Sequence, residues 1–316
     1  MTSALLLVVY TLFAGTVLPQ AIQRRGLLRT SPRLAIAVWH ALILSVVLAA
    51  LSSGLSLTLG LTHVSTDIAS LVDLCASNVK HNFAPPRGGV ASLAGLAVFA
   101  VLSVRLAWAA TRIVLKSAME RRRTVRTLDV VGRPNVVLGA LVIEHDTPYA
   151  FCVPGRRPRV VLTSALVTSL TGDQIRAVTA HERAHLAQRH HLALILSQAA
   201  SEAFFNALPL FRIAEQQIAQ LIEVCADDTA RRRVGALPLR EALSRLTWNP
   251  ASSVVLAATA NGVEDRLARL DAPRQSLTTR RTFFTGAAVG LAALSTIAIA
   301  AAPAVATAWD GLCLIA

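Results

Sequence analysis

The sequence has few charged residues. Only 16% of its 316 residues are Asp, Glu, Lys or Arg, whereas 54% are hydrophobic and the mean hydropathy is +0.54. A soluble globular domain is about a quarter charged and close to half apolar. This shortage of charge argues against an ordinary soluble domain and favours a membrane protein.

Acidic residues are scarcer still, with 18 Asp and Glu against 31 Lys and Arg, and the formal net charge is +13. A protein that binds nucleic acid can show such an excess. Here the arginines flank apolar runs instead of forming one stripe, as the positive-inside rule predicts for a membrane protein. We therefore expect a lipid bilayer as partner and no direct contact with nucleic acid.

Four stretches with almost no charge are long enough to cross a bilayer, which requires about 20 apolar residues. They cover about residues 3–22, 34–61, 90–110 and 283–309. The first lacks the basic segment that precedes the apolar core of a signal peptide, so we expect an uncleaved span. Arg105 lies near the end of the third, where its long side chain is expected to extend to the headgroups.

The basic residues indicate how these spans are oriented. They gather between spans one and two, after span three and before span four: Arg24, Arg25, Arg29, Arg33, Lys116, Arg121, Arg122, Arg123, Arg126, Arg274, Arg280 and Arg281. Positive segments stay in the cytoplasm, so we expect a multi-pass cell-membrane protein with both termini outside. The predicted domains are residues 1–113 with three spans, 114–281 in the cytoplasm, and 282–316 with the fourth span and an outer tail.

The enclosed segment has the size of one domain and mixes strands with helices. Strands are expected within residues 139–154 and 158–164, separated by the turn-forming PGRRP. Residues 170–208 predict one long helix or two consecutive ones, starting at a capping box of Thr171 and Gln174. In its second half, polar residues four apart favour an amphipathic helix, packed on the domain or lying on the membrane surface, over a fifth span. Residues 214–233 predict a further helix, and the remainder to about Pro273 looks helical without recognisable chemistry.

Residues 181–191, HERAHLAQRHH, contain four histidines and one glutamate. His181 and His185 are four residues apart, so on a helix both imidazoles project from one face and can bind one tetrahedral ion. Glu182 would lie close to a water on that ion but turned away from direct ligation. It can then take the proton of the water as general base and pass it to a leaving amine. The spacing H-E-x-x-H thus indicates Zn²⁺ as cofactor and peptide hydrolysis as reaction.

A catalytic zinc ion normally has three protein ligands and keeps one position for water. Of the five glutamates after His185, only Glu223 has an aspartate, Asp227, four residues further on. Both would face the same side of one helix, Glu223 as third ligand and Asp227 as a carboxylate that orients a ligand imidazole. The alternative is a solvated acidic patch paired with the arginines that follow. The apolar neighbours of Glu223 favour the ligand.

Other polar residues near these motifs have less defined roles. His190 and His191 do not repeat the helical position of His185, so a surface or headgroup contact is favoured over a fourth ligand. Cys225 would lie off the face of the two carboxylates and is expected to be a small buried thiol. Asp228 is expected to be solvated.

The motif HERAH, the motif EVCAD that begins 38 residues after His185, and the preceding FCVPGRRPRVVLTSALVTSLTGDQIRAVTAHE resemble the BlaR/MecR family of membrane zinc peptidases. The layout of three spans, an enclosed domain and a fourth span is similar too. The resemblance implies an α-helical integral membrane protein with an inserted α+β gluzincin-type zinc metallopeptidase domain. It implies His181, His185 and Glu223 as zinc ligands, Glu182 as base and Asp227 as the orienting carboxylate.

The same resemblance implies a function. Members of this family are membrane sensors whose protease domain acts on a cytoplasmic winged-helix repressor, so a signal-transducing endopeptidase with a protein substrate is expected. Their penicillin-binding domain follows the last span, and because only about seven residues follow Trp309 here, sensing by acylation is not expected. Two alternatives stay open: an HtpX/Ste-like quality-control protease, which shares both zinc motifs, and a non-catalytic zinc-binding scaffold, which would not need Glu182.

Residues 158–163, PRVVLT, precede the catalytic helix. We expect this segment to be the strand to which an extended substrate adds. Backbone pairing would then hold the peptide across the zinc ion with little demand on its side chains.

Four cysteines divide between the two sides of the membrane. The topology above puts Cys75 and Cys313 outside, and Cys152 and Cys225 in the cytoplasm. A disulfide is chemically permitted only for the outer pair, because the cytoplasm is reducing. Two unrelated outer thiols remain the alternative.

Overall fold

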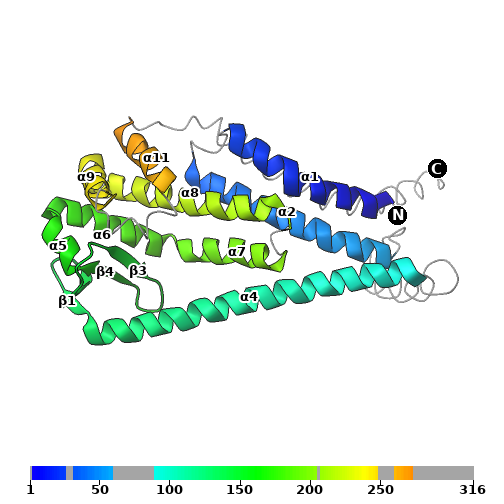
Figure 1. The fold of residues 1–316 in the computed structure, drawn as a ribbon, viewed down its shortest axis with the longest axis horizontal. Helices are drawn as coiled ribbons and strands as arrows, with labels where there is room; N and C mark the ends of the chain where they lie inside the picture. Colours follow the sequence, from blue (N-terminus) through cyan, green and yellow to red (C-terminus); the bar gives the residue numbers. More distant parts are fainter. Residues whose placement is uncertain (1, 26–30, 60–88, 205–206, 248–259, 273–316) are drawn as a thin grey trace, which may run out of the picture.

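Three long apolar helices form one part of the structure, a computed structural model that describes residues 2–25, 31–59, 89–204, 207–247 and 260–272 (Figure 1). They are α1 (Thr2–Arg25), α2 (Pro32–Leu59) and α4 (Gly89–Val131). Each contains a stretch long and apolar enough to cross a membrane, at Ala4–Gln23, Pro32–Leu57 and Ser92–Val131. The first three predicted spans are therefore helical. The fourth lies outside the described residues, as do Cys75 and Cys313.

The helix α4 continues far beyond the predicted third span. It has 43 residues, which is about 65 Å at 1.5 Å per residue. The predicted domain boundary between residues 113 and 114 therefore lies inside one continuous helix. Figure 1 shows α4 running from the apolar bundle to the sheet at the other end of the molecule.

A four-stranded sheet lies beside the C-terminal end of α4 (Figure 1). Its strands are β1 (Arg133–Asn135), β2 (Ala140–Ile143), β3 (Ala150–Val153) and β4 (Arg159–Thr163). The strands predicted in residues 139–164 are thus confirmed.

The order of the strands is β1-β2-β4-β3, with β4 parallel to β2 and antiparallel to β3. Both edges of β4 are therefore occupied. The prediction that a substrate adds to residues 158–163 is wrong, because an added strand needs a free edge.

The remaining described helices are α5 (Ser164–Ser169), α6 (Gly172–Ala187), α7 (His190–Ala203), α8 (Pro209–Val234), α9 (Ala236–Thr247) and α11 (Ala260–Asp271). The predicted capping box at the start of α6 is present in both directions between Thr171 and Gln174. Two helices, not one, cover residues 170–208. The break lies at Arg189, whose φ of 51° is left-handed and ends the regular helix there.

The sheet holds α6 in place through its apolar residues. Leu162 of β4 packs in one buried cluster with Ile175 and Val178 of α6. On the other face of the sheet, Val161 packs with Leu128 of α4. Successive residues of a strand point to opposite faces, so β4 ties α6 to α4 across the sheet.

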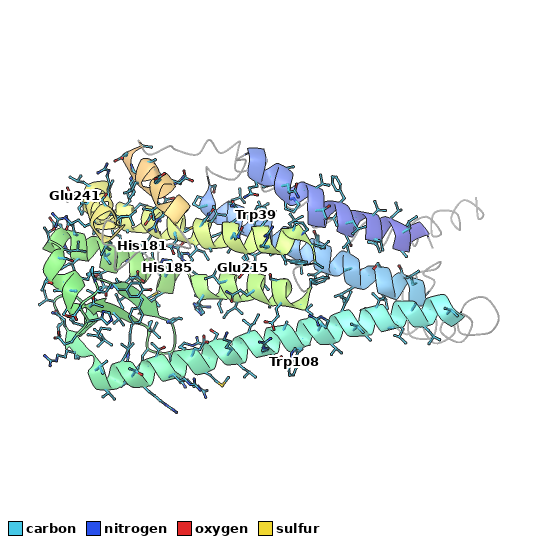
Figure 2. All side chains as sticks on the ribbon, in the orientation of Figure 1. Trp39, Trp108, His181, His185, Glu215 and Glu241 are labelled. Atoms are coloured by element: carbon cyan, nitrogen blue, oxygen red, sulfur yellow. The ribbon has the colours of Figure 1, made fainter. Side chains whose placement is uncertain are left out.

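The helices α7 and α8 pack against the apolar bundle. Trp39 and Val46 of α2 share a buried cluster with Phe211 and Ile218 of α8. Figure 2 shows Trp39 among the helices, whereas Trp108 projects from α4 away from them and is 70% exposed. The apolar bundle and the second half of the chain thus share one core.

The 14 residues of α7 are too few to cross a bilayer, and α7 packs along α2, α4 and α8. One of the two arrangements predicted for this amphipathic segment, packing on the protein, is therefore observed. Its Glu202 side chain pairs with Arg112. Arg105 donates from Nε to the carbonyl of Ala203 at 2.9 Å and from Nη2 to that of Glu202 at 3.1 Å. The expectation that Arg105 extends to the headgroups is wrong, because its guanidinium caps the end of α7.

Candidate metal centre

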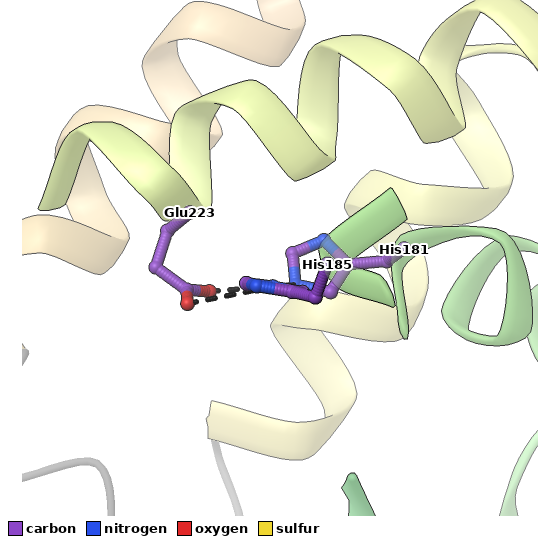
Figure 3. A group of neighbouring side chains, drawn as sticks. All are labelled: His181, His185 and Glu223. Carbon is purple, nitrogen blue, oxygen red and sulfur yellow. Dashed lines mark hydrogen bonds and ion pairs between the residues drawn. The ribbon is translucent and has the colours of Figure 1, made fainter. Parts of the chain in front are cut away.

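Two histidines of α6 and one glutamate of α8 face one another (Figure 3). His185 Nε2 lies 3.1 Å from His181 Nε2, and the Glu223 carboxylate lies 3.4 Å from His181 Nε2 and 3.6 Å from His185 Nε2. His181 is buried, and the other two are partly buried. The structure thus brings together the three residues that the sequence suggested as metal ligands.

Small residues on both helices allow this approach. Ala177 and Ala180 of α6 share a buried cluster with Ala230 of α8. Because the distance between packed helix axes depends on the side chains at the contact, alanines bring α6 and α8 close. His181 and His185 lie one helical turn apart and therefore both face α8.

Asp227 lies behind His181, on the same side of α8 as Glu223. Its Oδ1 is 2.9 Å from His181 Nδ1, and its side chain is only 3% exposed. The other ring nitrogen of His181, Nε2, is left to face Glu223. Asp227 therefore occupies the position expected for a carboxylate that orients a ligand imidazole.

Arg266 of α11 is a residue of this site for which the sequence gave no signal. Its guanidinium donates to both oxygens of Asp227, at 2.6 and 2.8 Å, and its Nη1 lies 3.2 Å from the Glu223 carboxylate. Burial would raise the pKa of Glu223, but contacts with His181 and Arg266 hold it at about 2. The same two partners outweigh burial at Asp227 and hold its pKa well below the usual range. Both carboxylates are therefore ionised at neutral pH.

The prediction of a surface role for His190 is also wrong. His190 is only 6% exposed, and its Nδ1 lies 3.0 Å from Nδ1 of His185. Burial lowers the pKa of both rings to about 4. The two imidazoles are therefore neutral, so one Nδ1–H can donate to the other ring while His185 Nε2 stays directed at Glu223.

Glu182 is half-buried beside this cluster and lies near Cys152 of the edge strand β3. Burial is the main cause that raises its pKa, and the charge of Glu223 adds to it, whereas His181 and Cys152 act in the opposite direction. Burial and the neighbouring Glu182 raise the pKa of Cys152 to about 12. The thiol therefore stays protonated and is available as a hydrogen-bond donor to the Glu182 carboxylate.

Two other sequence expectations near the site have different outcomes. Cys225 is a buried thiol, as predicted. Asp228 is not simply solvated, because Arg269 of α11 donates to its carboxylate at 3.1 Å. The helix α11 thus supplies an arginine to each of the two neighbouring aspartates of α8.

The donor set fits zinc. Zn²⁺ takes imidazole nitrogen and carboxylate oxygen at about 2.0–2.2 Å in a tetrahedron, which puts its ligand atoms about 3.3–3.6 Å apart. The two ring nitrogens lie 3.1 Å apart, and each lies 3.4 or 3.6 Å from a different oxygen of Glu223, which is close to this spacing. Each donor also has an orienting partner: Asp227 for His181, His190 for His185 and Arg266 for Glu223.

Residues 115–266 match the sequence model of peptidase family M48. The matched range contains every residue of the cluster described above, from Cys152 to Arg266. The match supports the M48 metallopeptidase family, whose peptidases depend on zinc. No curated protein and no solved structure matches the chain.

Proposed function

We propose that the chain is a membrane-bound zinc endopeptidase that cleaves a protein substrate at the cytoplasmic face. The observation that carries this proposal is the approach of two imidazole nitrogens, 3.1 Å apart, to the Glu223 carboxylate, one oxygen of which lies 3.4 Å from His181 Nε2 and the other 3.6 Å from His185 Nε2, next to the half-buried Glu182. The M48 match supports peptide hydrolysis. The apolar helices α1, α2 and α4 and the distribution of arginines support the membrane and its orientation.

In this proposal His181, His185 and Glu223 hold the metal. Zinc there would polarise a water molecule and the carbonyl of the scissile bond. Glu182 accepts a proton from that water and delivers it to the leaving amine. Its raised pKa suits both steps, because a group that takes up and releases a proton acts best near the working pH. The Cys152 thiol holds the carboxylate in position.

The substrate would add to β3 rather than to β4. β3 is an edge of the described sheet, and its Cys152 contacts the catalytic glutamate. The carbonyl of Tyr149 accepts from the Thr163 backbone, so in the antiparallel ladder Ala150 and Cys152 direct their backbone groups to the free edge. An extended peptide paired there lies next to Glu182.

The resemblances to the BlaR/MecR family and to HtpX/Ste-type proteases suggest two classes of substrate. A winged-helix repressor in the cytoplasm would make the chain a signal-transducing protease, as in the BlaR/MecR family. Unfolded or surplus membrane proteins would make it a quality-control protease of the HtpX/Ste type. We place the repressor first, because the order of spans and enclosed domain resembles the BlaR/MecR layout.

The deciding experiment compares the proteomes of cells that express wild type or Glu182→Gln. Gln keeps the size of the side chain but cannot accept the proton of the water. Accumulation of one transcriptional repressor in the Gln variant supports signalling, and accumulation of many membrane proteins supports quality control. Identical proteomes with full zinc content in both proteins would favour a non-catalytic scaffold.

A further inference from the structure

At the tip of the hairpin between α7 and α8, the described residues 199–204 and 207–214 lie against the middle of the apolar helices and not at their ends. Leu208 packs so closely on Gly15 of α1 that a Cβ at Gly15 would lie 2.7 Å from its Cδ1. Phe211 and Ala214 share a buried cluster with Trp39 and Val46 of α2. Figure 1 shows α7 and α8 running side by side with α2 and α4, with their junction beside the middle of α2.

The depth of this tip can be read along α1. Gly15 precedes Arg24, the first charged residue of the helix, by nine residues, which is about 13 Å along the axis. The hydrocarbon layer of a bilayer is about 30 Å thick. If α1 crosses the bilayer with Arg24 at its cytoplasmic boundary, the tip lies almost halfway into the hydrocarbon.

The hairpin has few charged residues at the depth of its tip and more polar residues closer to the expected membrane surface. Within the described part of residues 199–214, the charged side chains are Glu202, paired with Arg112, and Arg212, whose long side chain can extend toward the headgroups. Further along α8, the polar residues Glu215, Gln216, Gln217 and Gln220 follow. Glu215 follows Phe211 by about 6 Å along α8, so the polar part begins toward the expected boundary.

The end of α7 has the internal cap that a helix end in lipid requires. Hydrocarbon offers no partner for the free carbonyls at a helix end, so such an end must be capped from within the protein. Arg105 provides this cap for Glu202 and Ala203, the last residues of α7. An arginine inside an apolar span is costly unless it pairs with carbonyls or acids. Its position is explained if the helix end that it caps lies in the same layer.

We propose that the α7–α8 hairpin is a re-entrant element that enters the bilayer from the side of the metal centre and contacts acyl chains at its tip. Ala207, which is exposed, forms that contact. The proposal rests on the membrane placement in the proposed function and not on catalysis.

The depth of the hairpin also determines how far the metal centre lies from the membrane surface. Glu223 follows Pro209 by fourteen residues, about 21 Å along α8, so the site lies within about 10 Å of the membrane surface. The substrates it fits are polypeptide segments held at that surface.

The experiment measures the depth of single nitroxide labels on the full-length protein in lipid vesicles. The four native cysteines are replaced by alanine, and one cysteine is introduced as Ala207→Cys, Phe13→Cys or Leu237→Cys. Phe13 is exposed on α1 and precedes Gly15, which Leu208 contacts, by two residues. Leu237 is exposed on α9, which lies at the end of the molecule that holds the sheet. Relaxation of each label by oxygen, which concentrates in lipid, is compared with relaxation by a nickel chelate, which stays in water.

We expect the label at position 207 to behave like the label at position 13. Oxygen should relax both labels strongly, and the nickel chelate should relax both several-fold less than it relaxes the label at position 237. An Ala207 label as open to the chelate as Leu237, with Phe13 in lipid, would overturn the re-entrant hairpin and leave the membrane placement intact. Labels in water at both Ala207 and Phe13 would overturn the membrane placement itself. Zinc content, measured on each labelled sample, shows that the metal centre has folded.

Discussion

Replacing Arg266 by alanine should destabilise the metal-free protein and increase the stabilisation that zinc provides. The guanidinium makes two hydrogen bonds to Asp227 and one contact to Glu223. The side chains of Arg266 and Asp227 are only 11% and 3% exposed. Without the arginine, the buried Asp227 and the partly buried Glu223 stay ionised with His181 as their main cationic partner. Zinc supplies the missing positive charge, so it should restore much of the loss.

The size of the effect follows from the burial of the pair. Breaking a buried ion pair by removing one partner costs about 3–5 kcal/mol. For a protein of this size, each kcal/mol lowers the unfolding midpoint by about 2–4 °C. The metal-free Arg266→Ala protein should therefore unfold about 6–20 °C below wild type. The neighbouring Arg269→Ala is the matched control, because Arg269 and Asp228 are about a third exposed and such pairs contribute about 1 kcal/mol or less.

The assay is thermal unfolding of the full chain in detergent, with and without zinc, for wild type and both variants. The largest zinc-induced rise in the midpoint should belong to Arg266→Ala. A metal-free Arg266→Ala protein that unfolds at the same temperature as Arg269→Ala would refute the role assigned to Arg266. So would an equal zinc-induced rise in all three proteins.

Three further predictions concern the residues around the metal centre. His190→Ala should weaken zinc binding by about 10–100-fold, because His185 loses the ring that orients it, whereas His191→Ala should not; competition with a chelator measures both, and equal affinities would contradict the role of His190. Ala150→Pro should abolish cleavage at unchanged zinc content, because proline removes a backbone donor from the free edge of the sheet; unimpaired cleavage would point to another docking surface. Cys152→Ala should move the acidic limb of the kcat/KM profile to higher pH, since the thiol lowers the pKa of Glu182 and activity requires the ionised carboxylate; an unmoved limb would argue against this hydrogen bond.

The short motifs were sufficient to predict which candidate donors lie together, because helical spacing fixes which side chains share a face. His181 and His185 must face one way whatever the rest of the fold does. Glu223 was found through the aspartate four residues after it. In both cases, the geometry that matters is local to one helix.

Contacts between distant elements could not be predicted in this way. Arg266 lies 39 residues after Asp227 on another helix, and nothing in its own segment marks it. The burial of His190 depends on the left-handed residue Arg189, which redirects the chain after α6. The central position of β4 reflects the order of strands, which alternation of apolar residues does not specify.

In the apolar segments too, local features could be predicted and contacts between distant helices could not. Their length and composition predicted α1, α2 and the start of α4 within a few residues, but not the end of α4 at Val131. The contact of Leu208 with Gly15 and the capping of α7 by Arg105 could not be predicted, because both depend on packing between helices far apart in the sequence. The boundary predicted at residue 113 falls inside α4, because a helix can continue from an apolar into a charged stretch.

The most direct test of the proposed chemistry pairs metal analysis with proteolysis in wild type, Glu182→Gln and a His181→Ala, His185→Ala double variant. The substrate is the protein that accumulates in cells expressing Glu182→Gln. We expect about one zinc per chain in the first two proteins, none in the third, and cleavage by wild type alone. Full zinc occupancy in the double variant would contradict the metal centre, and cleavage by Glu182→Gln at the wild-type rate would contradict the catalytic base.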